Sequence, residues 1–110
     1  MKIRVSKLDA EFALAIKERD GWECRRCGRS KAQGWAIHAA HVFSRRIRAT
    51  RWDAQNLFSL CFVCHRWAHD WPLEFHVWVR DQLGDAVYES LAERARRVDV
   101  RNPKKEVPDD

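Results

Sequence analysis

Residues able to move protons or bind metal are concentrated in the middle of this 110-residue chain. They are four histidines and one asparagine: His38, His41, Asn56, His65 and His69. Histidine titrates near neutral pH, so it can take a proton from water, and in its neutral form it can bind a divalent ion. Hydrolysis of a phosphodiester needs an activated water, neutralised phosphate charge and a stabilised leaving oxygen. Histidines can supply the first of these directly and the others through a bound ion.

The four cysteines form two Cys-x-x-Cys pairs, Cys24 with Cys27 and Cys61 with Cys64. The N-terminus lacks an apolar signal segment, so we expect a cytoplasmic chain whose thiols stay reduced. Paired Cys-x-x-Cys motifs in such a chain favour metal binding over a disulfide or a redox function, which remain the alternatives. Four thiolates leave no open position on a zinc ion, so the predicted Cys₄ zinc site is structural.

The order His41, Asn56, His65, with a Cys-x-x-Cys pair directly before the last histidine, resembles the HNH family of nucleases. The resemblance covers roughly residues 20–70. It implies an α+β fold, the ββα-metal finger, with His41 as general base and His65 as a ligand of a catalytic ion. Asn56 would hold the segment that carries the base, or help to bind the metal. The implied activity is metal-dependent hydrolysis of phosphodiester bonds in duplex DNA, leaving 5′-phosphate and 3′-hydroxyl ends, with Mg²⁺, Mn²⁺, Ni²⁺ or Zn²⁺ as the ion.

One position departs from the family pattern. An acid or a histidine usually stands directly before the base as a metal ligand, and this chain has Ala40 there. His38, two residues before Ala40, and His69, one helical turn after His65, are the candidate replacements; they are not exclusive, and His38 is slightly favoured. If neither binds, the metal is held weakly or the site is degenerate. Ala40 also favours the alternative function, a zinc-finger module that binds DNA or a protein partner without cutting. Small members of the family are common in phages, some beside DNA-packaging genes, which makes phage packaging proteins candidate partners.

The charge balance favours a polyanionic partner but is weak evidence alone. Lysine and arginine total 21 against 16 acidic residues, a formal net charge of +5. Four arginines follow the predicted base with no acid before Asp53, and we expect them to contact DNA phosphates: Arg45, Arg46, Arg48 and Arg51. No apolar run is long enough to cross a membrane.

The hydrophobic spacing predicts the elements that position these residues. We expect a packing helix that starts at Ser6, strands over residues 35–43 and 57–60, a helix over residues 61–69, and two more helices, the first ending at Gly84. The predicted inward stripes are Leu8, Phe12, Ala15 and Ile16; Val63, Trp67 and Trp71; Trp71, Phe75, Trp78 and Val79; and Tyr88, Leu91, Ala95 and Val98. One domain is expected over residues 1–98, with its core in residues 20–70, followed by a loose charged tail over residues 99–110.

Overall fold

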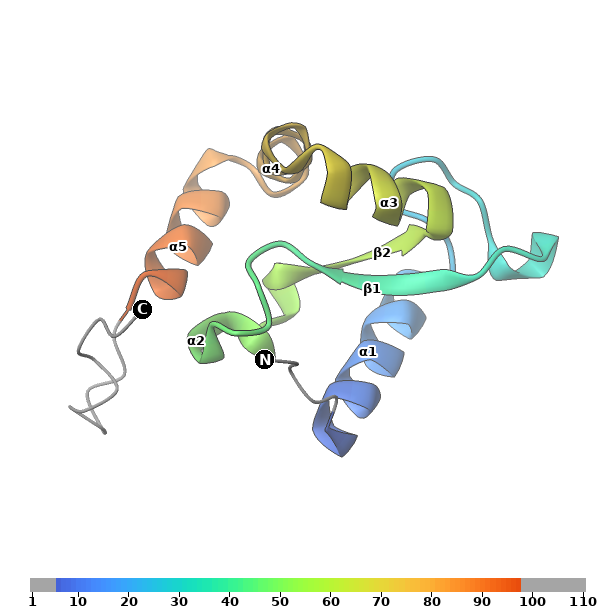
Figure 1. Ribbon diagram of the computed structural model, residues 1–110, viewed down its shortest axis with the longest axis horizontal. Coiled ribbons are helices and arrows are strands. Elements are labelled where there is room, and N and C mark those ends of the chain that lie inside the picture. The colour runs from blue at the N-terminus through green and yellow to red at the C-terminus, as the bar shows by residue number, and fades with distance from the viewer. Residues whose placement is uncertain (1–5, 98–110) are drawn as a thin grey trace.

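The computed structural model describes residues 6–97 as a two-stranded antiparallel sheet surrounded by helices (Figure 1). The α+β prediction is confirmed. The elements in chain order are α1 (Lys7–Arg19), the 3₁₀ turn η1 (Lys31–Gln33), β1 (Ile37–His41), α2 (Arg48–Arg51), the 3₁₀ turn η2 (Ala54–Asn56), β2 (Leu57–Cys61), α3 (Phe62–Asp70), α4 (Pro72–Leu83) and α5 (Asp85–Ala95).

The hairpin of β1 and β2 is the centre of the molecule. Its register pairs Ile37 with Cys61 and His41 with Leu57. Every residue of β2 is buried, because α1 packs on one side of the hairpin and α3 on the other (Figure 1). The predicted connection between the strands is not a plain loop, since it contains the single helical turn α2 and the turn η2.

Helix α1 begins as predicted but presents a different face to the hairpin. Ser6 and Asp9 form a capping box at its N-terminus. Leu8 is 48% exposed and Ala15 is also exposed, so the predicted stripe is wrong at these two positions. The buried residues of α1 are Asp9 and Ile16, because the Asp9 carboxylate has hydrogen-bond partners inside the molecule.

The start of α4 at Pro72 and its end at Gly84 are confirmed. The predicted stripe of α3 is wrong at Val63 and Trp71, which are both exposed, and Cys64 and Ala68 form its buried face. Cys64 has to face the other cysteines, and this requirement sets the rotation of the helix. Phe75 and Val79 of α4 are buried as predicted, and Val98 and the tail lie outside the described residues.

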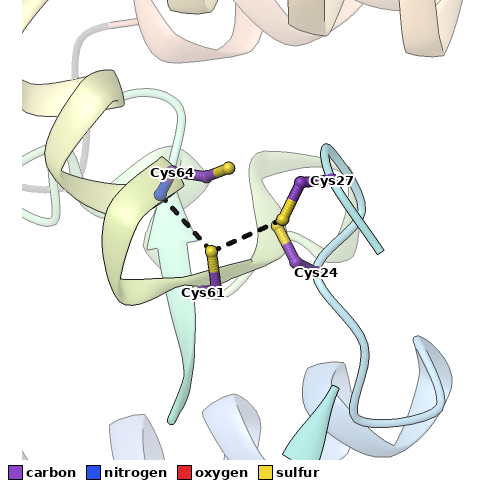
Figure 2. A group of neighbouring side chains, drawn as sticks. All are labelled: Cys24, Cys27, Cys61 and Cys64. Carbon is purple, nitrogen blue, oxygen red and sulfur yellow. Dashed lines mark hydrogen bonds between the residues drawn. The ribbon is translucent and has the colours of Figure 1, made fainter. Parts of the chain in front are cut away.

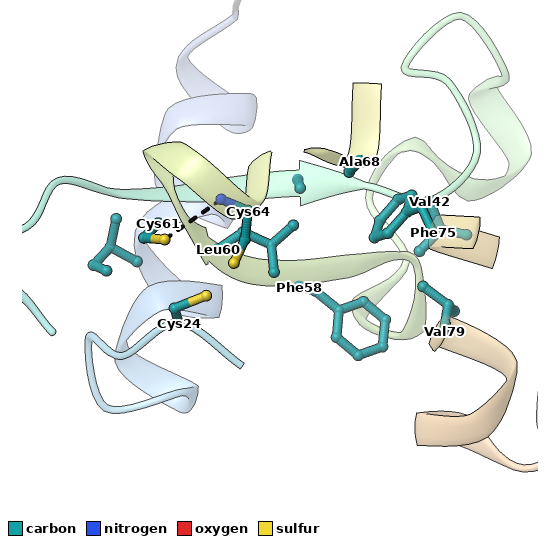
Figure 3. Close-up of a cluster of buried hydrophobic side chains, with 11 residues drawn as sticks. Cys24, Val42, Phe58, Leu60, Cys61, Cys64, Ala68, Phe75 and Val79 are labelled. Atoms are coloured by element: carbon teal, nitrogen blue, oxygen red, sulfur yellow. Dashed lines mark hydrogen bonds between the residues drawn. The ribbon is translucent and has the colours of Figure 1, made fainter. Parts of the chain in front are cut away.

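The hydrophobic core continues directly into the cysteine cluster. Figure 3 shows Cys24, Cys61 and Cys64 beside Leu60, with Phe58 further along the same cluster. A chain of this length buries a modest core, so a metal bound by these sulfurs would add stability where the apolar contacts end.

Candidate metal centre and histidine cleft

The four cysteine sulfurs gather at one point, as the sequence predicts. They lie within 4.8 Å of one another, and the Cys27 and Cys61 sulfurs are 3.6 Å apart (Figure 2). Two sulfurs on one tetrahedral zinc, each at about 2.3 Å from the ion, would be about 3.8 Å apart. The donor set and its spacing therefore fit a structural metal such as zinc.

Local backbone geometry places each cysteine pair. In the first pair, the Gly28 amide donates to the Cys24 carbonyl at 2.9 Å, and Gly28 has a φ of +84°, which glycine adopts without strain. In the second pair, Cys61 is the N-cap of α3, and its sulfur accepts from the Cys64 amide at 3.5 Å. One pair thus sits on a tight turn and the other on a helix start, and the two face each other.

Two arginines that the sequence patterns did not single out contact these sulfurs. The Arg26 guanidinium donates to the Cys64 sulfur at 3.4 Å and stacks on the Trp67 ring, with 3.6 Å between its central carbon and the ring centroid. The Arg29 guanidinium donates to the Cys27 sulfur at 3.4 Å and lies 4.6 Å from the centroid of Trp35. A tetrathiolate zinc site carries two excess negative charges, which these cations offset. The signal was present in the sequence as an arginine within the first Cys-x-x-Cys and another two residues after it.

Without a bound cation, the four thiols of the cluster would not all be ionised. Burial raises the pKa of the Cys64 thiol to about 12, and Arg26 only partly opposes this effect. Burial also raises the pKa of Cys27, but hydrogen bonds from the Arg29 amide and the neighbouring thiols outweigh it and bring the pKa down to about 7. A full set of four thiolates therefore requires a bound positive charge.

Three of the predicted histidines form a chain of ring contacts. The Nδ1 atoms of His38 and His65 are 2.9 Å apart, and the Nε2 atoms of His65 and His69 are 3.3 Å apart. His65 therefore uses opposite ring nitrogens toward its two neighbours. Within residues 6–97, the four cysteines are the only group of three or more histidine, cysteine or acidic side chains whose ligand atoms converge on one point. The three histidines do not converge in this way.

His41 and His65 line the same cleft, which also includes His69, Asp9 and Arg45 and has a volume of about 590 Å³. Burial lowers the pKa of His41, and the nearby charges of Arg45 and Arg51 lower it further. Burial and the three neighbouring histidines lower the pKa of His65 to about 4. Both rings are therefore neutral at neutral pH.

The His41 ring is oriented by a main-chain carbonyl. Its Nε2 lies 3.2 Å from the carbonyl oxygen of Arg51. A carbonyl can only accept, so Nε2 carries the proton and Nδ1 keeps a lone pair.

Asn56 is fully buried and ties together the segment that follows His41. Its Oδ1 accepts from the Phe43 amide at 2.8 Å, and its Nδ2 donates to the carbonyls of Phe43 and Thr50 at 3.0 and 2.9 Å. These bonds occupy both ends of the side-chain amide. Of the two roles the resemblance left open for Asn56, this geometry suits holding the backbone.

The four predicted DNA-contact arginines have different surroundings. Arg46 and Arg48 are exposed, and Arg45 lines the cleft. The Arg51 guanidinium points inward: its Nη2 lies 2.5 Å from Asp9 Oδ2, and its side chain is 15% exposed. Arg51 is therefore unsuited to phosphate contact, because its charge is already paired inside the molecule.

In comparisons with known proteins, no family model, no curated protein and no solved structure matches this chain. Within the described part of the chain, no helix is both long and apolar enough to cross a membrane.

Proposed function

We propose that the protein is a metal-dependent endonuclease of the HNH type that hydrolyses phosphodiester bonds in duplex DNA. The observation that supports this most is the cleft lined by both His41 and His65: His41 is a neutral imidazole whose Nε2 is bound to a carbonyl, and His65 contacts two more histidines. The order β1, connection, β2, α3 also agrees with the ββα-metal finger that the sequence resemblance implies.

His65 and His69 are the proposed ligands of the catalytic ion, both through Nε2. Their 3.3 Å separation is close to the spacing of about 3.3 Å that two nitrogens would have on a tetrahedral zinc ion with bonds of about 2.05 Å. His38 is then an outer partner: its Nδ1 accepts a hydrogen bond from Nδ1–H of His65, which leaves the His65 Nε2 lone pair for the ion. This assignment favours His69 over His38 as the replacement for the ligand missing at Ala40, the reverse of the preference drawn from the sequence.

His41 is the proposed general base. With its Nε2 proton bound to the Arg51 carbonyl, Nδ1 can take a proton from a water molecule in the cleft. The resulting hydroxide attacks phosphorus, the bond from phosphorus to the 3′ oxygen breaks, and the departing oxygen takes a proton from solvent water, so the products carry 5′-phosphate and 3′-hydroxyl ends. A divalent ion would supply neutralisation of the phosphate charge and stabilisation of the departing oxygen.

Arg45, Arg46 and Arg48 are the proposed phosphate contacts, since they follow His41 in the chain and Arg45 lines the cleft. Such contacts position a duplex and read little of its sequence. The proposed structural zinc site lies at the C-terminal end of β2. At that end, Cys61 leads directly into α3, the helix that carries His65.

The alternative is a zinc-finger module that binds DNA or a protein without cutting. The favouring observation is that His38, His65 and His69 form a chain and do not converge as ligands. This alternative predicts a salt-sensitive DNA complex and no cleavage with any added ion.

The deciding experiment is plasmid cleavage with Mg²⁺, Mn²⁺ or Ni²⁺, using wild type, His41→Ala, His65→Ala and the exposed-site control Gln82→Ala. We expect wild type and Gln82→Ala to convert supercoiled plasmid, and both histidine variants to lose at least about 100-fold in rate while retaining their zinc. If wild type and His41→Ala leave the plasmid equally intact, the nuclease proposal is wrong and the binding module is favoured.

A further inference from the structure

Asp9 is a buried carboxylate on α1, a helix that the sequence pattern assigned to packing only. We propose that Asp9 is a positioning residue for His41, acting through the ion pair that fixes Arg51 and hence the Arg51 carbonyl. The catalytic part of this inference rests on the proposed nuclease function, and the geometric part does not.

The Asp9 carboxylate is held by donors from two parts of the chain, one distant in sequence and one local. Arg51 donates through Nε to Oδ1 at 2.9 Å and through Nη2 to Oδ2 at 2.5 Å, and the Trp52 indole donates to Oδ1 at 2.9 Å. The Ser6 amide and hydroxyl donate to Oδ2 at 2.8 and 2.9 Å. Two parallel hydrogen bonds to a guanidinium restrict its orientation as well as its distance. Asp9 is only 8% exposed, so solvent screens this pair little.

The ion pair between Asp9 and Arg51, called the clamp below, holds α2 in place. Arg51 is the last residue of α2, a single helical turn of four residues, and such a turn is not stable alone. Asn56 holds the carbonyl of Thr50, and Asp9 holds the side chain of Arg51. The Arg51 carbonyl accepts from His41 Nε2 at 3.2 Å. Its position is therefore restricted by two contacts, one to the preceding residue and one to the side chain of Arg51 itself.

Two further observations connect Asp9 with the histidine rather than with folding alone. Asp9 lines the same cleft as His41. Its charge also acts on His41 in the opposite direction to that of Arg51, so the pairing shields the imidazole from a nearby cation. Without the clamp, α2 would lose one of its anchors and the His41 ring would lose its fixed acceptor.

The test compares Asp9→Asn with Trp52→Phe, which removes one donor to the carboxylate but leaves the ion pair with Arg51. The first readout is the Nε2–H proton of His41 in ¹H–¹⁵N NMR, which needs neither substrate nor a catalytic ion. We expect a slowly exchanging signal in wild type and Trp52→Phe, and its loss in Asp9→Asn. The second readout is plasmid cleavage, where Asp9→Asn should lose about 10- to 100-fold in kcat with little change in the KM for DNA.

A folded Asp9→Asn protein that keeps the His41 signal overturns the inference, whatever its activity. If Asp9→Asn does not fold, Arg51→Gln removes the same ion pair and is judged by the same two readouts. If both variants unfold, the clamp is structural and the positioning inference is rejected. Failure of wild type to cut DNA would reject the proposed function, and the NMR comparison would still decide whether Asp9 orients His41.

Discussion

At the scale of single residues, buried polar side chains hold the cleft in shape. Asn56 bridges Phe43 and Thr50, which lie on either side of the arginine-rich part of the connection, and Asp9 holds Arg51. Each of these groups is buried and makes several hydrogen bonds, so removing one leaves donors or acceptors that water does not reach. The cleft should therefore be sensitive to changes that leave the apolar core intact.

Replacing Asn56 with alanine should destabilise the protein by about 3 kcal/mol, because the amide and carbonyl of Phe43 lose their partner and the Thr50 carbonyl loses one of its donors, at a position where Asn56 itself is fully buried. Urea denaturation monitored by tryptophan fluorescence measures the change. Gln82→Ala, at an exposed position of α4, is the matched control and should be neutral. A change of less than about 1 kcal/mol for Asn56→Ala would contradict this description of the site.

Asp9 should make stability depend on pH in the acid range. The hydrogen bonds from Arg51 hold the pKa of Asp9 well below 3.8, although burial opposes them. The unfolded chain therefore binds this proton first as the pH falls, so the stabilisation is complete above about pH 5 and is lost progressively as the pH falls from there toward the lowered pKa of the folded state.

The expected measurement is a free energy of unfolding that falls more steeply below pH 4 in wild type than in Asp9→Asn. Protonation of the zinc thiolates affects both proteins, so the difference between the two curves isolates Asp9. Parallel curves between pH 5 and pH 3 would show that this carboxylate is not specially stabilised in the folded state.

At the scale of elements, the cysteine cluster joins two parts of the chain that share no regular secondary structure. The turn over residues 24–29 meets the junction of β2 and α3 through the four sulfurs. Main-chain support is limited, but it includes the Arg25 amide donating to the Ser59 carbonyl at 2.8 Å. The metal should therefore set how firmly this turn is attached.

Removal of zinc should lower the thermal midpoint of unfolding substantially, since binding energy at such a site is folding energy. Cys61→Ser should have the same effect, because Cys61 is fully buried and also caps α3. Differential scanning fluorimetry with and without a chelator measures both. An unchanged midpoint after chelation, with zinc loss verified by metal analysis, would exclude a structural metal.

Arg26→Met should weaken zinc retention by about tenfold while keeping much of the packing on Trp67, since methionine preserves length and removes charge. Competition with a chromogenic chelator gives the zinc affinity. Arg66→Met is the matched control, because Arg66 is exposed and pairs with Asp70 on the surface. Equal zinc affinities for the two variants would mean that the Arg26 charge is unimportant to the site.

Spacing alone predicted much of the fold, and its failures have a common cause. Short periodic signals identified the hairpin, the capping box at Ser6 and the ends of α4, because these depend on neighbouring residues. Which face a helix buries depends on distant partners. Asp9 turns inward toward Arg51, 42 residues away. Leu8 and Trp71 are exposed because of tertiary contacts, which helical periodicity does not predict. The cysteine cluster was predictable because its spacing encodes the chemistry directly.

At the scale of the whole molecule, the proposed function requires basic charge where a duplex would lie. The chain has a formal net charge of +5, and the segment beside the cleft carries Arg45, Arg46 and Arg48. Arg51 belongs to the same run in the sequence but is paired with Asp9. The charge available to DNA is therefore smaller than the sequence suggests.

The double variant Arg45→Gln and Arg48→Gln should bind duplex DNA more weakly and with less dependence on salt. Removing each arginine that touches a phosphate should reduce the slope of log K against log salt concentration by about 0.9, because fewer counterions are released on binding. Fluorescence anisotropy at several NaCl concentrations gives this slope, and a His41→Ala background prevents cutting during the measurement. Arg96→Gln, at an exposed arginine that ends α5, is the matched control and should leave the slope unchanged. If the double variant and the control have equal slopes, the segment beside the cleft does not bind the DNA backbone, and the surface proposed for the duplex is wrong even if the zinc site and the hairpin are as described.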